Sequence, residues 1–143
     1  MFERYVEKAR QAIVFSKYTA DQFGSPEIDT DHILMALLED AGLTECLLQD
    51  LSVKDIREEI RARASRPPMR LEPYDSRLTK DSKQALLFAV EEAHDLGHRH
   101  VGNEHILVGL LRVENCTAAQ ILQAKGLSAD KVRSRITASN ESK

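Results

Sequence analysis

Two short stretches of the chain combine a small polar residue, a carboxylate and a histidine at the expected start of a helix. A helix N-terminus offers unpaired backbone N–H groups to an anion, and a neighbouring carboxylate can hold a guanidinium through paired hydrogen bonds. Both stretches are therefore candidate sites for a ligand that carries an anion and a guanidinium. Their members are Thr30, Asp31 and His32 in the first stretch and Asn103, Glu104 and His105 in the second.

Helix initiation alone explains the same positions without any ligand. Thr30 and Asn103 suit the N-cap, and Asp31 and Glu104 would lie in the first turn, where a negative charge offsets the helix dipole. Ligand binding and helix initiation both stay open at this point. The histidine of each stretch is predicted to form a hydrogen bond across a helix–helix contact rather than to act as a base, because no second catalytic group is repeated beside it.

A third group of side chains has the composition of a metal site. His94, His98 and His100 lie close together in the sequence, and a small metal-dependent enzyme built on them is one alternative. Gly97 is predicted to end a helix between the first two histidines. That break favours a solvated helix end over a metal site.

The sequence contains none of the short motifs GxxxxGK[ST], GxSxG and HExxH, which mark nucleotide binding, acyl transfer and zinc peptidases. Cys46 and Cys116 lie far apart without a CxxC pair, and we expect both to be buried small apolar residues. The sequence therefore predicts a non-enzymatic chain without a cofactor or metal, which does not hydrolyse ATP by itself.

The charge balance also narrows the class of partner. The formal net charge is −3 at pH 7, and charged residues of both signs make up 30% of the chain. Such a surface has no net positive potential that would attract nucleic acid or an anionic membrane. No apolar run approaches the roughly 18 residues of a membrane span, so we expect a cytoplasmic chain that binds neither.

The chain is an internal duplication. Shifting the sequence by 73 positions aligns ten identical residues within about thirty positions, which identifies two copies of one unit. The identities join Gln11 to Gln84, Ala12 to Ala85, Phe15 to Phe88, Ala20 to Ala93, Gly24 to Gly97, His32-Ile33-Leu34 to His105-Ile106-Leu107, and Leu37-Leu38 to Leu110-Leu111.

Each copy is predicted to contain the same four helices. A long amphipathic helix ends at Gly24 in the first copy and at Gly97 in the second, where each glycine occupies the position of a C-cap. The other expected helices are a second at about 31–39 and 104–112, a third at about 44–49 and 117–124, and a fourth that is capped by Ser52 or Ser128.

Two four-helix units of about 60 residues would each be marginally stable alone. We therefore predict an all-α single domain over residues 1–143, in which two tandem four-helix repeats, about eight helices, share one core with pseudo-twofold symmetry. The expected boundaries are repeat one at about 2–64, an arginine- and proline-rich linker at about 65–77, repeat two at about 78–138 and a polar tail at 139–143.

The start of the first long helix carries more large side chains than one core can accept. Some of them are expected to form an exposed surface for a partner, although most should be core. The residues are Phe2, Tyr5, Arg10, Ile13, Val14 and Lys17.

The paired motifs PEIDTDHILMALL and RHVGNEHILVGLL resemble the doubled N-terminal repeat of the Clp family of AAA+ unfoldases, and most of all its ClpC branch. The likeness covers nearly the whole chain, from MFERYVEKARQAI to about Ile136. It implies a domain tethered ahead of ATPase rings, which unfold proteins and pass them to a protease chamber. In that family the domain receives adaptor proteins, tagged substrates and, in some members, arginine-phosphorylated proteins.

The resemblance also implies site residues. The family's phosphoarginine pockets correspond here to Thr30, Asp31, Asn103 and Glu104, and its cyclic-peptide inhibitors lie against a surface that corresponds to Phe2, Arg10, Ile13 and Val14. The family pattern is usually Gly-Thr-Glu-His. Asp31 is one methylene shorter than that glutamate, and Asn103 replaces the hydroxyl by an amide, which puts phosphoarginine binding in question at both sites.

Two non-enzymatic roles fit this resemblance. One is a recognition domain for adaptors and substrates that works with a Clp ATPase ring and, indirectly, with its protease. The other is a stand-alone regulator or scaffold protein that uses the same fold.

Overall fold

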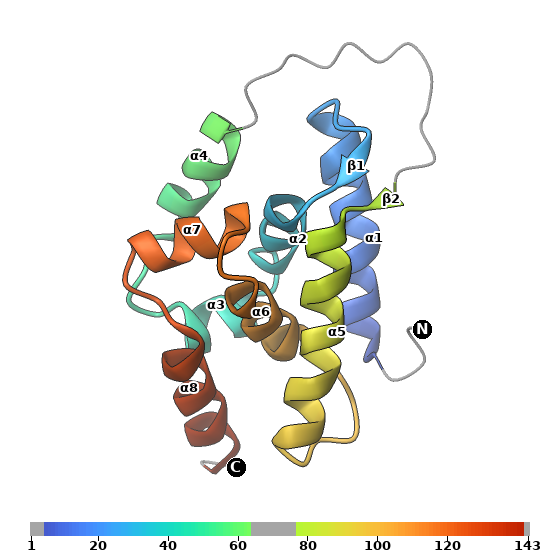
Figure 1. The fold of residues 1–143 in the computed structure, drawn as a ribbon. Coiled ribbons are helices and arrows are strands. Elements are labelled where there is room, and N and C mark those ends of the chain that lie inside the picture. Colours follow the sequence, from blue (N-terminus) through green and yellow to red (C-terminus); the bar gives the residue numbers. More distant parts are fainter. Residues whose placement is uncertain (1–4, 64–76, 142–143) are drawn as a thin grey trace.

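The structure, a computed structural model, describes residues 5–63 and 77–141 and contains eight helices and two short strands within these ranges (Figure 1). Each repeat contributes four helices, which confirms the predicted all-α fold. Repeat one contains α1 (Glu7–Gln22), β1 (Glu27–Ile28), α2 (Thr30–Leu37), α3 (Ala41–Leu47) and α4 (Val53–Arg63). Repeat two contains β2 (Arg77–Leu78), α5 (Lys80–Asp95), α6 (Asn103–Arg112), α7 (Thr117–Ala124) and α8 (Ala129–Glu141).

The predicted ends of the long helices are confirmed at the two matched glycines. Gly24 and Gly97 follow α1 and α5 with φ of 69° and 75°, a conformation that glycine adopts without steric penalty. Beyond them, the Ser25 N–H donates to the Ala20 carbonyl at 2.9 Å, and the His98 N–H donates to the Ala93 carbonyl at 2.8 Å. These bonds complete the same C-terminal cap in both repeats.

The predicted N-caps of α2 and α6 are wrong by one residue. Asp29 and Gly102 are the caps, with extended backbone at ψ of 173° and 179°, whereas Thr30 and Asn103 already belong to the helices. The histidines explain the shift, because Nδ1 of His32 and of His105 each accepts the backbone N–H of its cap residue at 2.9 Å. A histidine at the third helical position thus performs the reciprocal half of a capping box.

The shorter helices differ from the prediction mainly at their ends. The hydroxyls of Ser52 and Ser128 accept backbone N–H groups at 3.2 Å and cap α4 and α8, as predicted. Helix α3 begins earlier than expected, because Asp40 caps it by accepting the Leu43 N–H at 3.3 Å. Helix α8 continues to Glu141 and so includes residues 139–141, which the sequence assigned to a polar tail. The predicted linker lies outside the described residues except for Arg77 in β2.

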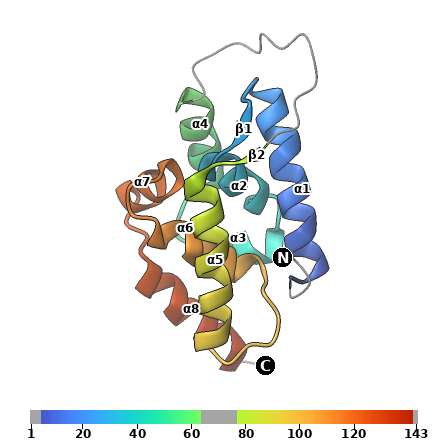
Figure 2. The ribbon, with the colours of Figure 1, turned by 45° about the vertical axis from the view of Figure 1, so that its right-hand side comes forward.

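The repeats are joined by two short parallel pairings that are symmetry equivalents. Ile28 pairs with Leu78 in the β1–β2 ladder, and Tyr5 forms a bridge with Val101. A shift of 73 positions turns Tyr5 into Leu78 and Ile28 into Val101, so each repeat presents the same two segments to the other. The structure therefore has the predicted pseudo-twofold relation. Ile28 and Val101 precede α2 and α6, and Figure 2 shows β1 and β2 side by side.

The core is one cluster that draws on both repeats. All residues of α2 are buried, as are those of α6 except Glu104 and Arg112. Helices α1 and α5 flank this pair, and α6 packs against α5 so closely that a Cβ at Gly109 would collide with the Ala85 carbonyl. The two motifs therefore begin two helices that are almost entirely buried.

Within the described ranges, no helix has the length and apolar character needed to cross a membrane.

Candidate binding site at the start of helix α6

Glu104 is the candidate residue with the most accessible carboxylate. It occupies the first turn of α6, its side chain is 43% exposed, and its Oε1 lies 3.4 Å from Nδ1 of His105. The cap residue Gly102 has no side chain, and a Cβ there would collide with this carboxylate. The glycine therefore leaves room for Glu104 to fold back over the start of its own helix.

Glu104 lines an open cavity of about 900 Å³ that we call the Glu104 cavity. Its walls come from the start of α1, from α3, from the α5–α6 loop and from Ile136 of α8. Its lining includes the cations Lys8 and Arg99, the histidines His98, His100 and His105, and the acidic residues Asp40 and Glu104. A carboxylate in one cavity with a lysine and an arginine suits a ligand that carries both a guanidinium and an anion.

A pair of histidines contributes to the lining of this cavity. Nε2 of His105 lies 2.8 Å from Nδ1 of His98, and the two ring centroids are 5.0 Å apart. Because Nδ1 of His105 accepts the Gly102 N–H, its proton must reside on Nε2, which donates to His98. Burial lowers the pKa of His105 and favours this neutral form. His98 is therefore held in place by a residue of the motif.

Asn103 connects the motif to the other repeat. It is 5% exposed, and its Nδ2 donates to Oδ2 of Asp40 at 2.9 Å, so the first residue of α6 is bonded to the N-cap of α3. Its Oδ1 is buried and has no hydrogen-bond partner among the described residues. The amide thus uses its donor for the fold and leaves its acceptor unused.

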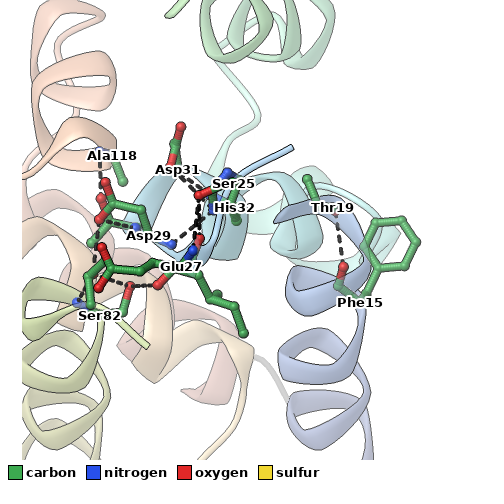
Figure 3. A network of polar contacts seen from close by, with 12 residues as sticks. Phe15, Thr19, Ser25, Glu27, Asp29, Asp31, His32, Ser82 and Ala118 are labelled. Atoms are coloured by element: carbon green, nitrogen blue, oxygen red, sulfur yellow. Dashed lines mark hydrogen bonds and ion pairs between the residues drawn. The ribbon is translucent and has the colours of Figure 1, made fainter. Parts of the chain in front are cut away.

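The equivalent motif of repeat one is closed by contacts with repeat two (Figure 3). Thr30 has no exposed surface, and its hydroxyl accepts the Ala118 N–H at 3.3 Å. Oδ1 of Asp29 accepts both the Thr30 N–H at 2.8 Å and the hydroxyl of Thr79 at 3.0 Å. Asp29 and Thr30, the two residues before Asp31, are therefore bonded to groups of repeat two.

Asp31 itself is poorly placed for an external ligand. The residue is 9% exposed, and its Oδ1 accepts the backbone N–H of His32 at 3.0 Å. Burial raises the pKa of this carboxyl, while burial lowers the pKa of the adjacent His32. Because this carboxylate is buried, an external guanidinium has little access to it.

The candidate surface on α1 is only partly exposed. Val14 is 71% exposed and Arg10 is exposed, whereas Ile13 packs against the core and Phe2 lies outside the described residues. A surface hollow of about 430 Å³ extends along this face, and its lining residues are Glu7, Arg10, Gln11, Val14, Phe15 and Tyr18. The sequence analysis did not include Phe15 and Tyr18 in this surface. Their spacing could have done so, because Gln11, Phe15 and Tyr18 lie four and three residues apart and therefore share one helix face.

The histidine metal hypothesis receives no support from the described residues. Within residues 5–63 and 77–141, no three His, Cys, Asp or Glu side chains converge as metal ligands. The second histidine of the triplet, His98, faces His105 instead. The prediction for the cysteines is correct for Cys116, whose thiol is buried and has a pKa raised by burial, and wrong for Cys46, which is exposed at the edge of the Glu104 cavity.

Comparison with known proteins identifies relatives over almost the whole chain. The family model of the Clp repeat N-terminal domain matches residues 4–125 and 77–141. The chain is 32% identical to the chloroplastic chaperone protein ClpC1 of Oryza sativa over 139 residues, and 35% identical to the chaperone protein ClpB of Oceanobacillus iheyensis over 150 residues. These alignments cover 95% and 99% of the chain, which spans 15% and 18% of the length of the two relatives.

A solved structure shares the fold. The crystal structure of the N-terminal domain of the Caseinolytic protease associated chaperone ClpD from Arabidopsis thaliana superposes with a TM-score of 0.77 at 24% sequence identity. The superposition covers 99% of this chain and 97% of that one. The arrangement of eight helices is therefore shared with that domain.

Proposed function

The chain belongs to the Clp repeat N-terminal domain family, and from this premise we propose that it is a non-enzymatic recognition domain that binds adaptor proteins and unfolded or arginine-phosphorylated protein substrates. The family corresponds to an N-terminal portion of Clp ATPases, in which the chain would act ahead of an ATPase ring and, indirectly, its protease. A cytoplasmic location is part of the proposal, although relatives include chloroplast proteins.

The observation that carries this proposal is the half-exposed carboxylate of Glu104 inside a cavity with cationic residues. Glu104 would accept paired N–H groups from an arginine side chain of the substrate. Lys8 and Arg99 are both exposed on the lining of the same cavity and would attract a phosphoryl group on that arginine. The site would thus recognise a charge pattern on a protein.

The two motifs would contribute unequally. The side chain of Asp31 is 12% exposed and that of Glu104 is 43% exposed, so the second motif supplies the accessible acceptor. Thr30 and Asp31 remain candidate ligand residues through the family resemblance alone. In this protein their contacts support a single dominant site at Glu104.

Calorimetric titration tests the proposal directly. The ligand is an unfolded protein such as casein, prepared with and without phosphorylated arginines, and the phosphorylated form is expected to bind more tightly. Glu104→Gln should weaken that binding about tenfold, which is the scale of one charge-assisted hydrogen-bonded pair. Glu114→Gln removes the same charge from an exposed position outside the cavity and is the matched control.

Two results would contradict the proposal. Failure of both casein preparations to bind the intact domain would remove the recognition role. Equal losses in Glu104→Gln and Glu114→Gln would show that net charge, rather than the cavity, attracts the substrate.

A further inference from the structure

Two consecutive hydrogen bonds connect the start of α6 to the α5–α6 loop beside the Glu104 cavity. The Gly102 N–H donates to Nδ1 of His105 at 2.9 Å, and Nε2 of the same ring lies 2.8 Å from Nδ1 of His98. His105 is buried, whereas His98 is half-buried on the lining of the cavity. Arg99, which follows His98 in the loop, belongs to the same lining.

The positions of the protons on this histidine pair follow from the first bond. A backbone N–H is always a donor, so Nδ1 of His105 is an acceptor and the proton of the neutral ring lies on Nε2. Nε2 therefore donates to Nδ1 of His98, and the neutral His98 ring carries its own proton on Nε2. The neutral pair thus holds two protons, and Nδ1 of each ring is a hydrogen-bond acceptor.

A third proton can enter the pair only by breaking one of the two hydrogen bonds. It must bind one of the two Nδ1 atoms, and each of these already accepts an N–H. The bond from Gly102 is buried, and its loss would leave a backbone N–H without a partner. His98 is only half-buried, so its charged ring can turn toward water. The third proton therefore belongs on His98, where it separates the two rings.

Charged groups on neighbouring helices face this pair. On α6, Oε1 of Glu104 lies 3.4 Å from Nδ1 of His105. On α5, the buried Glu92 is bonded to Arg112 of α6 and Arg133 of α8, which offset its charge. Burial lowers the pKa of His105 most, Glu104 raises it, the other ring of the pair lowers it and Glu92 raises it. Burial therefore keeps His105 neutral at pH values where an exposed histidine is charged.

The fixed charges on the lining of the Glu104 cavity are balanced. Lys8 of α1 and Arg99 of the loop are cations. Asp40 and Glu104 are carboxylates, so the two signs cancel. The remaining titratable residues of the lining, besides the histidine pair, are Cys46 of α3 and His100 of the loop. A third proton on the pair therefore makes the lining positive.

We propose that the His98–His105 hydrogen bond holds the α5–α6 loop against the cavity only while the pair is neutral, and that uptake of the third proton releases the loop. Arg99 moves with the loop, so acid weakens the recognition of a phosphoryl group. His105 is thus a positioning residue that acts through His98. The inference rests on the proposed function, in which Arg99 attracts the phosphoryl group.

The release is local, because both ends of the loop have backbone hydrogen bonds that do not titrate. The His98 N–H donates to the Ala93 carbonyl at 2.8 Å, and the Val6 N–H donates to the Val101 carbonyl at 2.9 Å. Residues 99–100 lie between these two bonds. The loss of the histidine contact therefore changes the part of the loop that lines the cavity and leaves the helices in place.

The new charge and the released loop have opposite effects on an anionic ligand. A protonated ring attracts the phosphoryl group, but a half-exposed charge is screened by water and contributes little. A direct charge-assisted hydrogen bond from Arg99 contributes more. Binding of phosphoarginine should therefore weaken as the pH falls below about 6.5, the ordinary pKa of a histidine.

In repeat one, the histidine of the motif has a different neighbour. His32 accepts the N–H of its cap residue at 2.9 Å, as His105 does. The position equivalent to His98 is Ser25, and the ring beside His32 is that of Phe23, with centroids 5.7 Å apart. Neither of these neighbours titrates near neutral pH. The pH-sensitive contact therefore belongs to the repeat that contains the accessible carboxylate.

Nuclear magnetic resonance of the ¹⁵N-labelled protein tests the hydrogen bond without any ligand. At pH 7.5 both rings should be Nε2–H tautomers, and a scalar coupling across the hydrogen bond should join Nε2 of His105 to Nδ1 of His98. At pH 5.5 the coupling should be lost, and ¹⁵N relaxation should show greater motion of Arg99 and His100. In His98→Asn the amide oxygen can accept from His105 without titrating, so the increase in motion at pH 5.5 should be absent.

Calorimetry with free phosphoarginine at the same two pH values tests the consequence for binding. The wild type should bind about fivefold more weakly at pH 5.5 than at pH 7.5. His98→Ala removes the contact and should bind at pH 7.5 at least as weakly as the wild type does at pH 5.5. His98→Asn keeps the contact and should lose less than about twofold between the two pH values.

The matched control is His94→Asn, which changes an exposed histidine of α5 outside the cavity and should keep the wild-type ratio of affinities. Because each ratio compares the same ligand at the same two pH values, the titration of phosphoarginine itself cancels between variants. Thermal unfolding of each variant confirms that it is folded.

The outcomes separate this inference from the proposed function. A coupling that is absent at pH 7.5 or persists at pH 5.5 would overturn the inference, as would an Nδ1–H tautomer of neutral His98. Equal ratios in the wild type and His98→Asn, or tighter binding of the wild type at pH 5.5, would overturn it as well. Failure of phosphoarginine to bind at either pH, with a coupling that is lost in acid, would refute the proposed function and keep the pH-sensitive contact.

Discussion

The starts of α2 and α6 share the sequence pattern of a small polar residue, an acid and His-Ile-Leu, yet one is closed and the other is open. At α2 the N-cap Asp29 has a side chain that bonds to Thr79 of repeat two. At α6 the N-cap Gly102 has none, and Glu104 remains 43% exposed. The comparison teaches that a duplicated motif can be used once to join the repeats and once to form a surface for a ligand.

The difference extends to the contacts between repeats. Thr30 and Asn103 each meet the start of a helix of the other repeat, Thr30 at Ala118 of α7 and Asn103 at Asp40 of α3. The first contact is made to a backbone N–H and satisfies the hydroxyl. The second is made to a carboxylate and leaves the amide oxygen without a partner among the described residues. Two open cavities adjoin the second motif, one lined by Asn103 and the other by Glu104.

The largest expected effect tests how differently the two central helices pack. Gly109 of α6 corresponds to Ala36 of α2, and a methyl group at Gly109 would collide with the backbone of α5. Gly109→Ala should lower the free energy of unfolding by about 3 kcal/mol, measured by urea denaturation, because rigid backbone must move. Ala36→Gly should lower it by only about 1 kcal/mol, mainly through helix propensity. Similar values for both variants would show that the helix pairs are equally close.

The closed state of the first motif can be broken at its cap. Asp29→Ala removes the acceptor for the Thr30 N–H and the Thr79 hydroxyl and should lower the free energy of unfolding by about 1–2 kcal/mol. Gly102→Ala at the matched position has no cap bond to lose, so its unfolding free energy should change by less than about 0.5 kcal/mol. The added methyl group should instead displace the Glu104 carboxylate and so weaken the binding of phosphoarginine. A large stability loss in Gly102→Ala would contradict this division of roles.

The accessible acid should dominate ligand binding. Glu104→Ala is expected to weaken the binding of free phosphoarginine about tenfold, or roughly 1.4 kcal/mol, because it removes a half-exposed charge-assisted acceptor. Asp31→Ala should weaken it less than about twofold, since Asp31 is 9% exposed and bonded to its own helix. Isothermal calorimetry measures both. Equal losses would show that the first motif binds the ligand as well.

The smallest expected effect is a pH dependence shared by the two motifs. Burial lowers the pKa of His32 and of His105 below that of the unfolded chain, so the unfolded state binds more protons as the pH falls below about 6.5. The free energy of unfolding should therefore be lower at pH 5.5 than at pH 7.5.

A double variant isolates the histidine contribution. His32→Gln with His105→Gln should weaken this pH dependence, because glutamine at the third helical position can still accept the cap N–H without titrating. Comparing the pH dependence of the double variant with that of the wild type also separates the contribution of the histidines from that of Asp31, whose pKa is raised by burial. An unchanged slope between pH 5.5 and 7.5 in the double variant would contradict the assignment.

Much of the fold was predictable because its signals are local. The Gly24 and Gly97 caps, the Ser52 and Ser128 caps and the apolar spacing each depend on a few neighbouring residues. The N-caps of α2 and α6 were misplaced because His32 and His105 perform a capping role that glutamate or glutamine usually performs. Cys46 was misjudged because its burial depends on how α3 meets α8 and the α5–α6 loop rather than on residue type.

By itself the sequence determined the helices, the duplication and the residue types at the two motifs, because periodicity, glycine conformation and caps act within a few residues. Only the tertiary structure decided which motif is accessible. Thr79 and Ala118 close the first motif, and Asp40 borders the second. Each lies 50 to 88 residues along the chain from the group that it contacts. Burial is a property of surfaces brought together by folding, so two similar local patterns have different exposures.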